Sequence, residues 1–365
     1  MKDILSEIVA HKRVELEALE AELPLEELRA MALAAPASTR SLRKALASSE
    51  SGIIAEFKRK SPSKGWIHRD ADPLKVIPEY VASGAAALSI LTDSEFFGGS
   101  LDYIKALRQS SAMPGLIGHP LPSIDLPILR KDFIISEYQL LEARLAGADA
   151  VLLIAACLNL EECTSLCAKA HGLGLEVLLE IHSENELIYA SCAPDCLGVN
   201  NRNLGTFVTD VANSFRLSEK LTNLEAGSIL GSSDALLCSE TTLANGLAAT
   251  EPDGTSVGED HATLGTVRGG TMSEANGGAE RSEASERPRV PSGDERAAGR
   301  SAKDDERTKV PPAAKKPVLV SESGISRPET VRELRAKGFR GFLMGENFMK
   351  EAEPGAALRN FIAEL

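Results

Sequence analysis

Short, mostly apolar runs alternate with helical segments along this chain, and that alternation limits its fold more than any other feature. Eight runs of three to six residues predict strands, at 53–57, 86–91, 127–130, 150–154, 175–180, 196–199, 318–320 and 341–344. Apolar residues at helical spacing predict helices between or after them, at 72–83, 101–109, 137–146, 160–171, 183–191, 327–337 and 354–364. Strands that alternate with helices are typical of parallel α/β folds.

Two parallel architectures fit this alternation, a closed (β/α)8 TIM barrel and an open doubly wound sheet. Eight strands favour the barrel, and no G-x-G-x-x-G motif follows the first strand, which counts against an open dinucleotide-binding sheet. Polar or glycine residues follow most strand ends: Glu56 with Lys58, Lys131 with Asp132, Glu180, Asn200 with Arg202, Glu322 with Ser323, and Gly345. Because such barrels build their sites at the carboxyl ends of the strands, we predict a TIM barrel with its site there.

The rest of the chain predicts additions to a barrel domain of residues 53–365. Residues 1–52 form an N-terminal helical extension, with amphipathic helices expected at about 4–21 and 24–33. Residues 224–316 contain no Phe, Trp or Tyr and are rich in Gly, Ser, Glu, Arg and Pro. Such a composition cannot bury enough apolar surface to offset the entropy of ordering. We therefore expect a mostly disordered insertion at 224–316, before the seventh strand, and a smaller one at 111–123.

Charge and cysteine spacing exclude several classes of function. The net charge of −13 and the lack of a basic stripe argue against a nucleic-acid partner. No apolar run is long enough to span a bilayer, and residues 1–20 are too charged for a signal peptide. The six cysteines lack metal-ligand spacing, so we expect reduced core thiols in a cytoplasmic protein.

The first strand and the loop after it, residues 53–65, read I-I-A-E-F-K-R-K-S-P-S-K-G. Residues two apart in a strand share a face, so Glu56 and Lys58 lie on the same side. A carboxylate and an ammonium at the mouth of a buried strand indicate acid–base chemistry. From these residues alone, a charged strand end beside solvent is an equal alternative.

These residues belong to a set of motifs that resembles the indole-3-glycerol-phosphate synthase family. The motifs follow one another in order: A-E-F-K-R-K-S-P-S-K-G at 55–65, L-S-I-L-T-D at 88–93, F-F-G-G-S at 96–100, L-R-K-D-F-I at 129–134, L-L-E-I-H at 178–182, N-N-R-N-L at 200–204, S-E-S-G-I at 321–325 and G-F-L-M-G at 341–345. The resemblance covers roughly residues 1–222 and 317–365. Each motif alone is weak evidence, whereas the ordered set at successive strand ends is strong.

The resemblance implies a cytoplasmic carbon–carbon lyase of tryptophan biosynthesis, with the N-terminal helix capping the barrel. Its phosphorylated small-molecule substrate would be 1-(2-carboxyphenylamino)-1-deoxyribulose 5-phosphate. Ring closure, decarboxylation and dehydration would give indole-3-glycerol phosphate. The ring nitrogen supplies the electrons, so no cofactor and no metal are expected. A monomer is implied, without nucleic acid or membrane as a partner, and contact with neighbouring tryptophan-pathway enzymes is left open.

Matching positions in the family imply the catalytic roles. Lys131 would be the general acid that protonates the substrate ketone; a strand-end lysine paired with Asp132 is the alternative. Lys58 would lie near the substrate carboxylate or phosphate and take part in dehydration. Glu56 would act as a base and orient the lysines, and Glu180 would be a second acid that helps the hydroxyl to leave. Lysines and glutamates crowded in one pocket push their pKa values apart, which acid–base catalysis uses.

Seven further positions match substrate-binding residues of the family. Asn200 and Arg202 would bind the substrate, since a guanidinium can fork onto phosphate or carboxylate oxygens. Backbone N–H groups after the seventh and eighth strands would bind the phosphate, in the segment of Ser323 and Gly324 and at Gly345. Ser61 in the first loop would also contact the substrate. Phe97 would lie along the aromatic ring of the substrate; an ordinary core aromatic is the alternative.

Two residues near the expected site need separate treatment. Glu346 departs from the small hydroxyl residue expected after the eighth-strand glycine, and a carboxylate there would repel the phosphate. We therefore expect only its backbone N–H to face the phosphate, with the side chain turned outward. His182 has no second histidine at ligand spacing, so we expect a solvated or structural residue instead of a metal ligand.

Two other functions compete with the synthase. Phosphoribosylanthranilate isomerase is another phosphate-binding barrel enzyme, but it works with a cysteine and an aspartate. The first strand here ends in Glu56 and Lys58, without a cysteine. A non-catalytic barrel scaffold that works through its insertion would be favoured by loss of Lys131 or Glu180, and both are present.

Overall fold

Eight parallel strands close into a barrel in the part of the chain that the structure describes. The computed structural model describes residues 4–112, 124–203, 208–222 and 316–365. Its barrel strands are β1 Ile53–Phe57, β4 Ala87–Leu91, β5 Ile128–Lys131, β6 Ala150–Ile154, β7 Glu176–Ile181, β8 Cys196–Asn200, β9 Val318–Glu322 and β10 Gly341–Met344. Each strand pairs with the next, and β10 pairs with β1. The predicted TIM barrel is confirmed, and every strand ends within two residues of its expected bounds.

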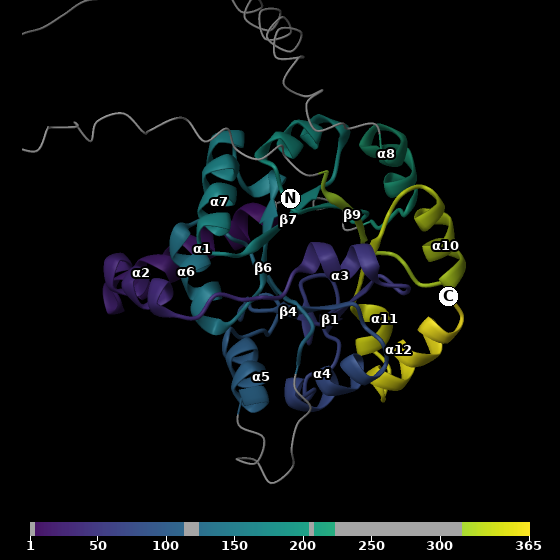
Figure 1. Ribbon diagram of the computed structural model, residues 1–365, viewed down its shortest axis with the longest axis horizontal. Coiled ribbons are helices and arrows are strands. Elements are labelled where there is room, and N and C mark those ends of the chain that lie inside the picture. Colours follow the sequence, from purple (N-terminus) through teal and green to yellow (C-terminus); the bar gives the residue numbers. More distant parts are fainter. Residues whose placement is uncertain (1–3, 113–123, 204–207, 223–315) are drawn as a thin grey trace, which may run out of the picture. The chain divides into compact units, whose positions relative to one another are not determined.

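Helices surround the barrel, as Figure 1 shows. They are α4 Pro73–Ala82, α5 Asp102–Ala112, α6 Glu137–Ala146, α7 Leu160–Gly172, the 3₁₀ helix η2 Glu184–Cys192, α8 Ala212–Thr222, α10 Pro328–Ala336 and α12 Pro354–Ala363, with the short η1 Ala155–Cys157 and α11 Glu346–Met349. Side-chain caps fix several starts: Asp72 accepts from the N–H of Leu74, and Ser136 forms a capping box with Gln139. None of the described helices is long and apolar enough to cross a membrane.

Strand side chains alternate between two apolar cores. Ile54 belongs to the core inside the barrel, whereas Ile53 and Ala55 pack in the core between the strands and the helices. Because the side-chain period of a strand is two, Glu56 follows Ile54 on the inner side, and Lys58 continues this direction just after β1. The interior is therefore apolar along the strands and becomes charged at their carboxyl ends.

The N-terminal extension has helices at both ends of the barrel. They are α1 Ile4–Glu22, α2 Leu25–Ala34 and α3 Leu42–Ser48. α1 contributes to the cavity at the carboxyl ends of the strands, and α2 packs against α6. The sequence did not predict α3, which puts Leu42 and Leu46 into the interior core. It lies at the amino ends of the strands, where the Ser41 hydroxyl donates to Glu176 at the start of β7.

Both predicted insertions, at 224–316 and at 111–123, lie outside the described residues except at their ends. The strands that flank them nevertheless pair directly. β8 pairs with β9 from Cys196 to Asn200, and β4 pairs with β5 from Leu88 to Leu91. The barrel therefore closes across both positions.

Candidate active site

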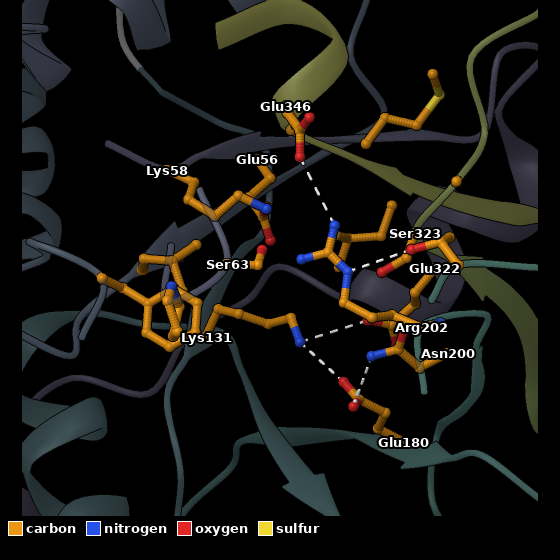
Figure 2. A pocket seen from close by; sticks show the side chains of 18 of the residues that line it. Glu56, Lys58, Ser63, Lys131, Glu180, Asn200, Arg202, Glu322, Ser323 and Glu346 are labelled. Atoms are coloured by element: carbon orange, nitrogen blue, oxygen red, sulfur yellow. Dashed lines mark hydrogen bonds and ion pairs between the residues drawn. The ribbon is translucent and has the colours of Figure 1, made fainter. Parts of the chain in front are cut away.

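A cavity of about 570 Å³ opens at the carboxyl ends of the strands, and Figure 2 shows the side chains that line it. Ten of the eleven residues predicted to form the site line this cavity, and they are Glu56, Lys58, Phe97, Lys131, Glu180, Asn200, Arg202, Ser323, Gly324 and Gly345. The exception is Ser61, which is buried in β2 Lys60–Ser61. The turn that follows it forms this part of the wall, with Pro62, Ser63 and Lys64.

Lys131 lies among three buried carboxylates. Its Nζ extends from the end of β5 to 2.9 Å from Glu180 Oε2 and 3.4 Å from Glu322 Oε2. Glu56 completes the group, and its Oε1 lies 2.7 Å from Nζ of Lys58. All three glutamates are no more than 3% exposed, so water screens their charges little. We call these five residues the charged cluster.

Burial and neighbouring charges separate the pKa values within the charged cluster. Burial raises the pKa of Glu322 to about 7, opposed by the Lys131 ammonium and supported by the charges of Glu180 and Glu56. Burial also opposes ionisation of Glu180, but the Lys131 ammonium and its hydrogen-bond donors hold the pKa of Glu180 well below its usual range. Burial disfavours the ammonium of Lys131, yet the carboxylates raise its pKa above the ordinary value. At neutral pH the cluster thus holds an ionised Glu180 and a partly protonated Glu322.

Two polar side chains orient Glu180. Asn200 Nδ2 donates to Glu180 Oε1 at 2.9 Å, and His182 Nε2 lies 3.1 Å from the same oxygen. Asn200 Oδ1 accepts from the backbone N–H of Arg202 at 3.0 Å, which fixes the orientation of the amide. Burial disfavours the protonated ring of His182, but the carboxylates of Glu180 and Glu186 favour it more strongly, so the pKa of His182 is raised above its ordinary value. The expected structural role of His182 has a geometric basis here, because it pairs with the carboxylate next to Lys131.

Apolar side chains form the other part of the wall. The rings of Phe97 and Phe133 lie 5.8 Å apart, and both line the cavity. α1 adds Ile4, Leu5 and Ile8 to the same wall. An amphipathic N-terminal helix therefore covers part of the site, as the resemblance implied.

Lys12 holds α1 at this end of the barrel. Its Nζ lies 3.1 Å from Asp93 Oδ2 and 3.2 Å from Asp132 Oδ1, and its side chain is 3% exposed. Burial disfavours the ammonium, but these carboxylates raise the pKa of Lys12 above its ordinary value. Asp132 also pairs with Arg130 at 3.1 Å. The alternative in which Asp132 is the partner of Lys131 is therefore wrong.

The loops after β9 and β10 depend on glycine. Ser323 and Gly324 both have positive φ, 66° and 77°, and a Cβ on Gly324 would come within 2.5 Å of Thr209. At Gly345 a Cβ would lie 2.4 Å from Oε1 of Glu56. Backbone therefore approaches the charged cluster closely enough to limit where Glu56 can move.

The side chain of Glu346 does not turn outward, and that prediction was wrong. It lines the cavity, where Nζ of Lys64 donates to Oε1 at 2.6 Å and Nη2 of Arg202 lies 3.6 Å from Oε2. The outward orientation was predicted from repulsion between a carboxylate and a phosphate and from the favourable charge at a helix N-terminus. That prediction missed the attraction of Lys64, which is 282 positions away in the sequence.

Several residues that line the cavity had no predicted role, and Glu322 and Phe133 are among them. Glu322 was noted at the end of a strand without an assignment, although it ends its strand much as Glu180 does at the end of β7. Phe133 follows Lys131 by two residues, a spacing that places it in the loop beside the carboxyl end of β5. Its position at a strand end could have marked Glu322 as a site residue, and its proximity to Lys131 could have marked Phe133.

A closed (β/α)8 barrel with buried lysine–carboxylate pairs at the carboxyl ends of its strands is the architecture of an acid–base barrel enzyme. The family model described as indole-3-glycerol phosphate synthase matches residues 5–241 and 303–361. This chain belongs to the indole-3-glycerol phosphate synthase family.

Several curated relatives named indole-3-glycerol phosphate synthase are similar to the chain. The protein of Bacteroides thetaiotaomicron is 44% identical over 362 residues, which cover 99% of this chain and 98% of the relative. That of Azoarcus sp. is 44% identical over 225 residues, 60% of this chain and 80% of the relative. That of Dechloromonas aromatica is 33% identical over 367 residues, 100% of both chains.

Proposed function

We propose that this chain is the carboxy-lyase that converts 1-(2-carboxyphenylamino)-1-deoxyribulose 5-phosphate into indole-3-glycerol phosphate. The observation that supports this most strongly is the Lys131 ammonium, enclosed by Glu180 and Glu322 at the base of the cavity. Ring closure onto a ketone requires a proton for the ketone oxygen, and a positioned acid provides typically ~10²–10⁴-fold in rate. Lys131 would supply that proton.

The first step forms a carbon–carbon bond. The ring carbon that bears the carboxylate attacks the ketone carbon, and the C=O π electrons move to the oxygen, which takes a proton from Lys131. The substrate nitrogen releases its lone pair into the ring and so drives the attack. The bond to the carboxylate then breaks, its electrons restore the aromatic ring, and carbon dioxide leaves.

Dehydration completes the indole. The new hydroxyl takes a proton and leaves as water while the nitrogen again donates electrons through the ring, and the neighbouring CH₂ carbon loses a proton. Glu322, whose pKa of about 7 keeps it partly protonated, suits the donor. Glu180, held ionised, suits the acceptor better than the role of second acid that the resemblance implied. Glu56 would orient Lys58, 2.7 Å away, toward the substrate carboxylate.

The phosphate and the aromatic ring of the substrate would occupy different ends of the cavity. The guanidinium of Arg202 and the backbone N–H groups near Gly324 and Gly345 would bind the phosphate. Phe97 and Phe133 would contact the aromatic ring. Independence from cofactors, a monomeric state and a cytoplasmic location complete this proposal and derive from the sequence resemblance alone.

The direct test mixes the purified protein with the carboxyphenylamino-ribulose phosphate in a buffer that contains a chelator and no cofactor. We expect a rise in indole fluorescence together with one carbon dioxide released per indole formed. A protein that forms no indole but isomerises phosphoribosylanthranilate would contradict the proposal and favour the isomerase. A protein that does neither would favour a non-catalytic barrel.

A further inference from the structure

We infer that Glu346 is a built-in anion that occupies the phosphate end of the cavity until a phosphate displaces it. This inference rests on the proposed function, which assigns Arg202 to the phosphate. Glu346 is the first residue of α11, and in Figure 2 its carboxylate points toward the guanidinium of Arg202. Lys64 donates to its Oε1 at 2.6 Å, and Arg202 Nη2 lies 3.6 Å from its Oε2. Each oxygen of the carboxylate therefore faces a cation from a different loop.

The carboxylate of Glu346 is ionised at neutral pH. Burial opposes its ionisation, but the hydrogen bond from Lys64 and the charges of Lys64, Lys58 and Arg202 hold the pKa of Glu346 below its usual range. A phosphate monoester carries close to two negative charges at pH 7 and three acceptor oxygens. It would satisfy the same cations better than one carboxylate, so the two anions compete for them.

Contacts of Lys64 extend this competition to the β2–β3 hairpin, in which β3 is Gly65–Trp66. The body of the hairpin is attached to the loop after β4, because Lys60 donates to the carbonyl of Glu95 and the ring of Trp66 lies against Gly98. The turn between β2 and β3 carries Lys64, which reaches Glu346 at the start of α11, just after the neighbouring strand β10. Glu346 thus ties the turn to the mouth of the cavity, and a phosphate would take over this contact.

A simple surface ion pair is the alternative explanation of these contacts. The position of the pair argues against it, because Lys64, Arg202 and Glu346 all line the cavity. The side chains of Arg202 and Glu346 are only 23% and 28% exposed, whereas that of Lys64 is 58% exposed, so the pair with Arg202 is the one shielded from solvent. Two like charges at this depth repel each other appreciably, so a phosphate bound to Arg202 would raise the free energy of an adjacent carboxylate.

The experiment measures the affinity of inorganic phosphate by titration calorimetry, which needs no turnover. We expect Glu346→Gln to bind phosphate about tenfold more tightly than the wild type, a change of about 1.4 kcal/mol. Glu329→Gln is the matched control, because it removes the same charge from an exposed side chain that pairs with Arg332, and neither residue is among those that line the cavity. Its affinity should stay within about twofold of the wild type, since exposed pairs contribute little. Glu346→Ser is a second variant that tests the same loss of charge.

Two readouts separate this inference from the proposed function. Trp66, the single tryptophan of the chain, should report phosphate binding through its fluorescence, with the midpoint shifted by the same factor in Glu346→Gln. If the Glu346 variants bind phosphate more tightly but the wild type forms no indole from its substrate, the inference is supported and the proposed function is overturned. Indole formation with unchanged or weaker phosphate binding in both Glu346 variants, or no phosphate binding by any of the proteins, would overturn the inference.

Discussion

Glu322 is 1% exposed, and its burial makes the stability of the protein depend on pH. Its pKa rises from an ordinary value of 4.5 to about 7 on folding, so between these values the folded state binds more protons than the unfolded state. The contribution of Glu322 to the free energy of unfolding therefore falls as pH rises through this window. The difference amounts to about 3 kcal/mol once the carboxyl is ionised.

Replacing Glu322 with Gln should remove this dependence. We expect the wild type to lose about 2–3 kcal/mol more than Glu322→Gln between pH 5 and pH 8, measured by urea unfolding. His182 also favours the folded state less as pH rises, but it is present in both proteins. Glu329→Gln, at an exposed ion pair with Arg332, serves as the control and should follow the wild type. If the free energy of unfolding changes with pH in the same way in the wild type and in Glu322→Gln, the pKa of Glu322 is not raised by burial as described.

Gly345 limits the position of Glu56, and this gives a second prediction for a single residue. In Gly345→Ala the new methyl would come within 2.4 Å of Glu56 Oε1, so the carboxylate or the loop must shift. We expect kcat/KM to fall at least about tenfold, because a displacement of ~1 Å in a site can cost ~10²-fold. Gly172→Ala, where nothing lies within 4 Å of the added atom, should leave kcat/KM unchanged. Equal activity of the two variants would show that Glu56 is not constrained as described.

α1 is attached to the barrel by a buried charge, which makes this helix sensitive to one substitution. Lys12→Met would remove the cation beside buried Asp93 and one of the two cations beside Asp132, and loss of one partner of a buried pair costs about 3–5 kcal/mol. Urea unfolding should report this loss, and KM should rise because α1 forms part of the cavity wall. Lys105→Met, at an exposed pair with Asp102, should cost less than about 1 kcal/mol. A similar small cost for both would mean that Lys12 does not hold α1.

Local pattern predicts the elements of this fold better than it predicts their contacts. Apolar runs located all eight strands, and strand-end polarity located eight of the ten predicted residues that line the cavity, because burial and pleat direction are local properties. Phe97 and Gly324 were expected there only once the family resemblance had been drawn. α3 was missed because its helix is short and its role depends on Leu42 and Leu46 filling the distant end of the barrel. The orientation of Glu346 depends on Lys64 in another loop, and no local pattern encodes it.

At the scale of the whole molecule, residues 242–302 lie outside the match to the family model. The family model matches residues 5–241 and 303–361, and β8 and β9 pair directly across the gap. We expect that a short Gly/Ser linker in place of residues 242–302 leaves kcat, KM and Tm nearly unchanged, because loop length affects closure entropy only logarithmically. A Tm several degrees lower, or a higher KM, would show that this segment contributes to the barrel or its site.

The account depends most on Lys131 as the proton donor in ring closure, since its ammonium is the group that the carboxylates of the charged cluster surround. Lys169→Met is a suitable control, because this lysine pairs with Glu137 at a side-chain exposure of 46%. The control should retain the kcat of the wild type. Loss of activity in Lys131→Met alone would then reflect the site and not the removal of a lysine.

The most direct measurement is therefore kcat of Lys131→Met for indole formation, with a urea titration to verify that the variant folds. We predict a kcat at least ~10²-fold below that of the wild type, the lower range for a positioned acid, with a far smaller change in KM. A folded variant that retains more than about a tenth of the wild-type kcat would contradict the assignment of Lys131 as the acid.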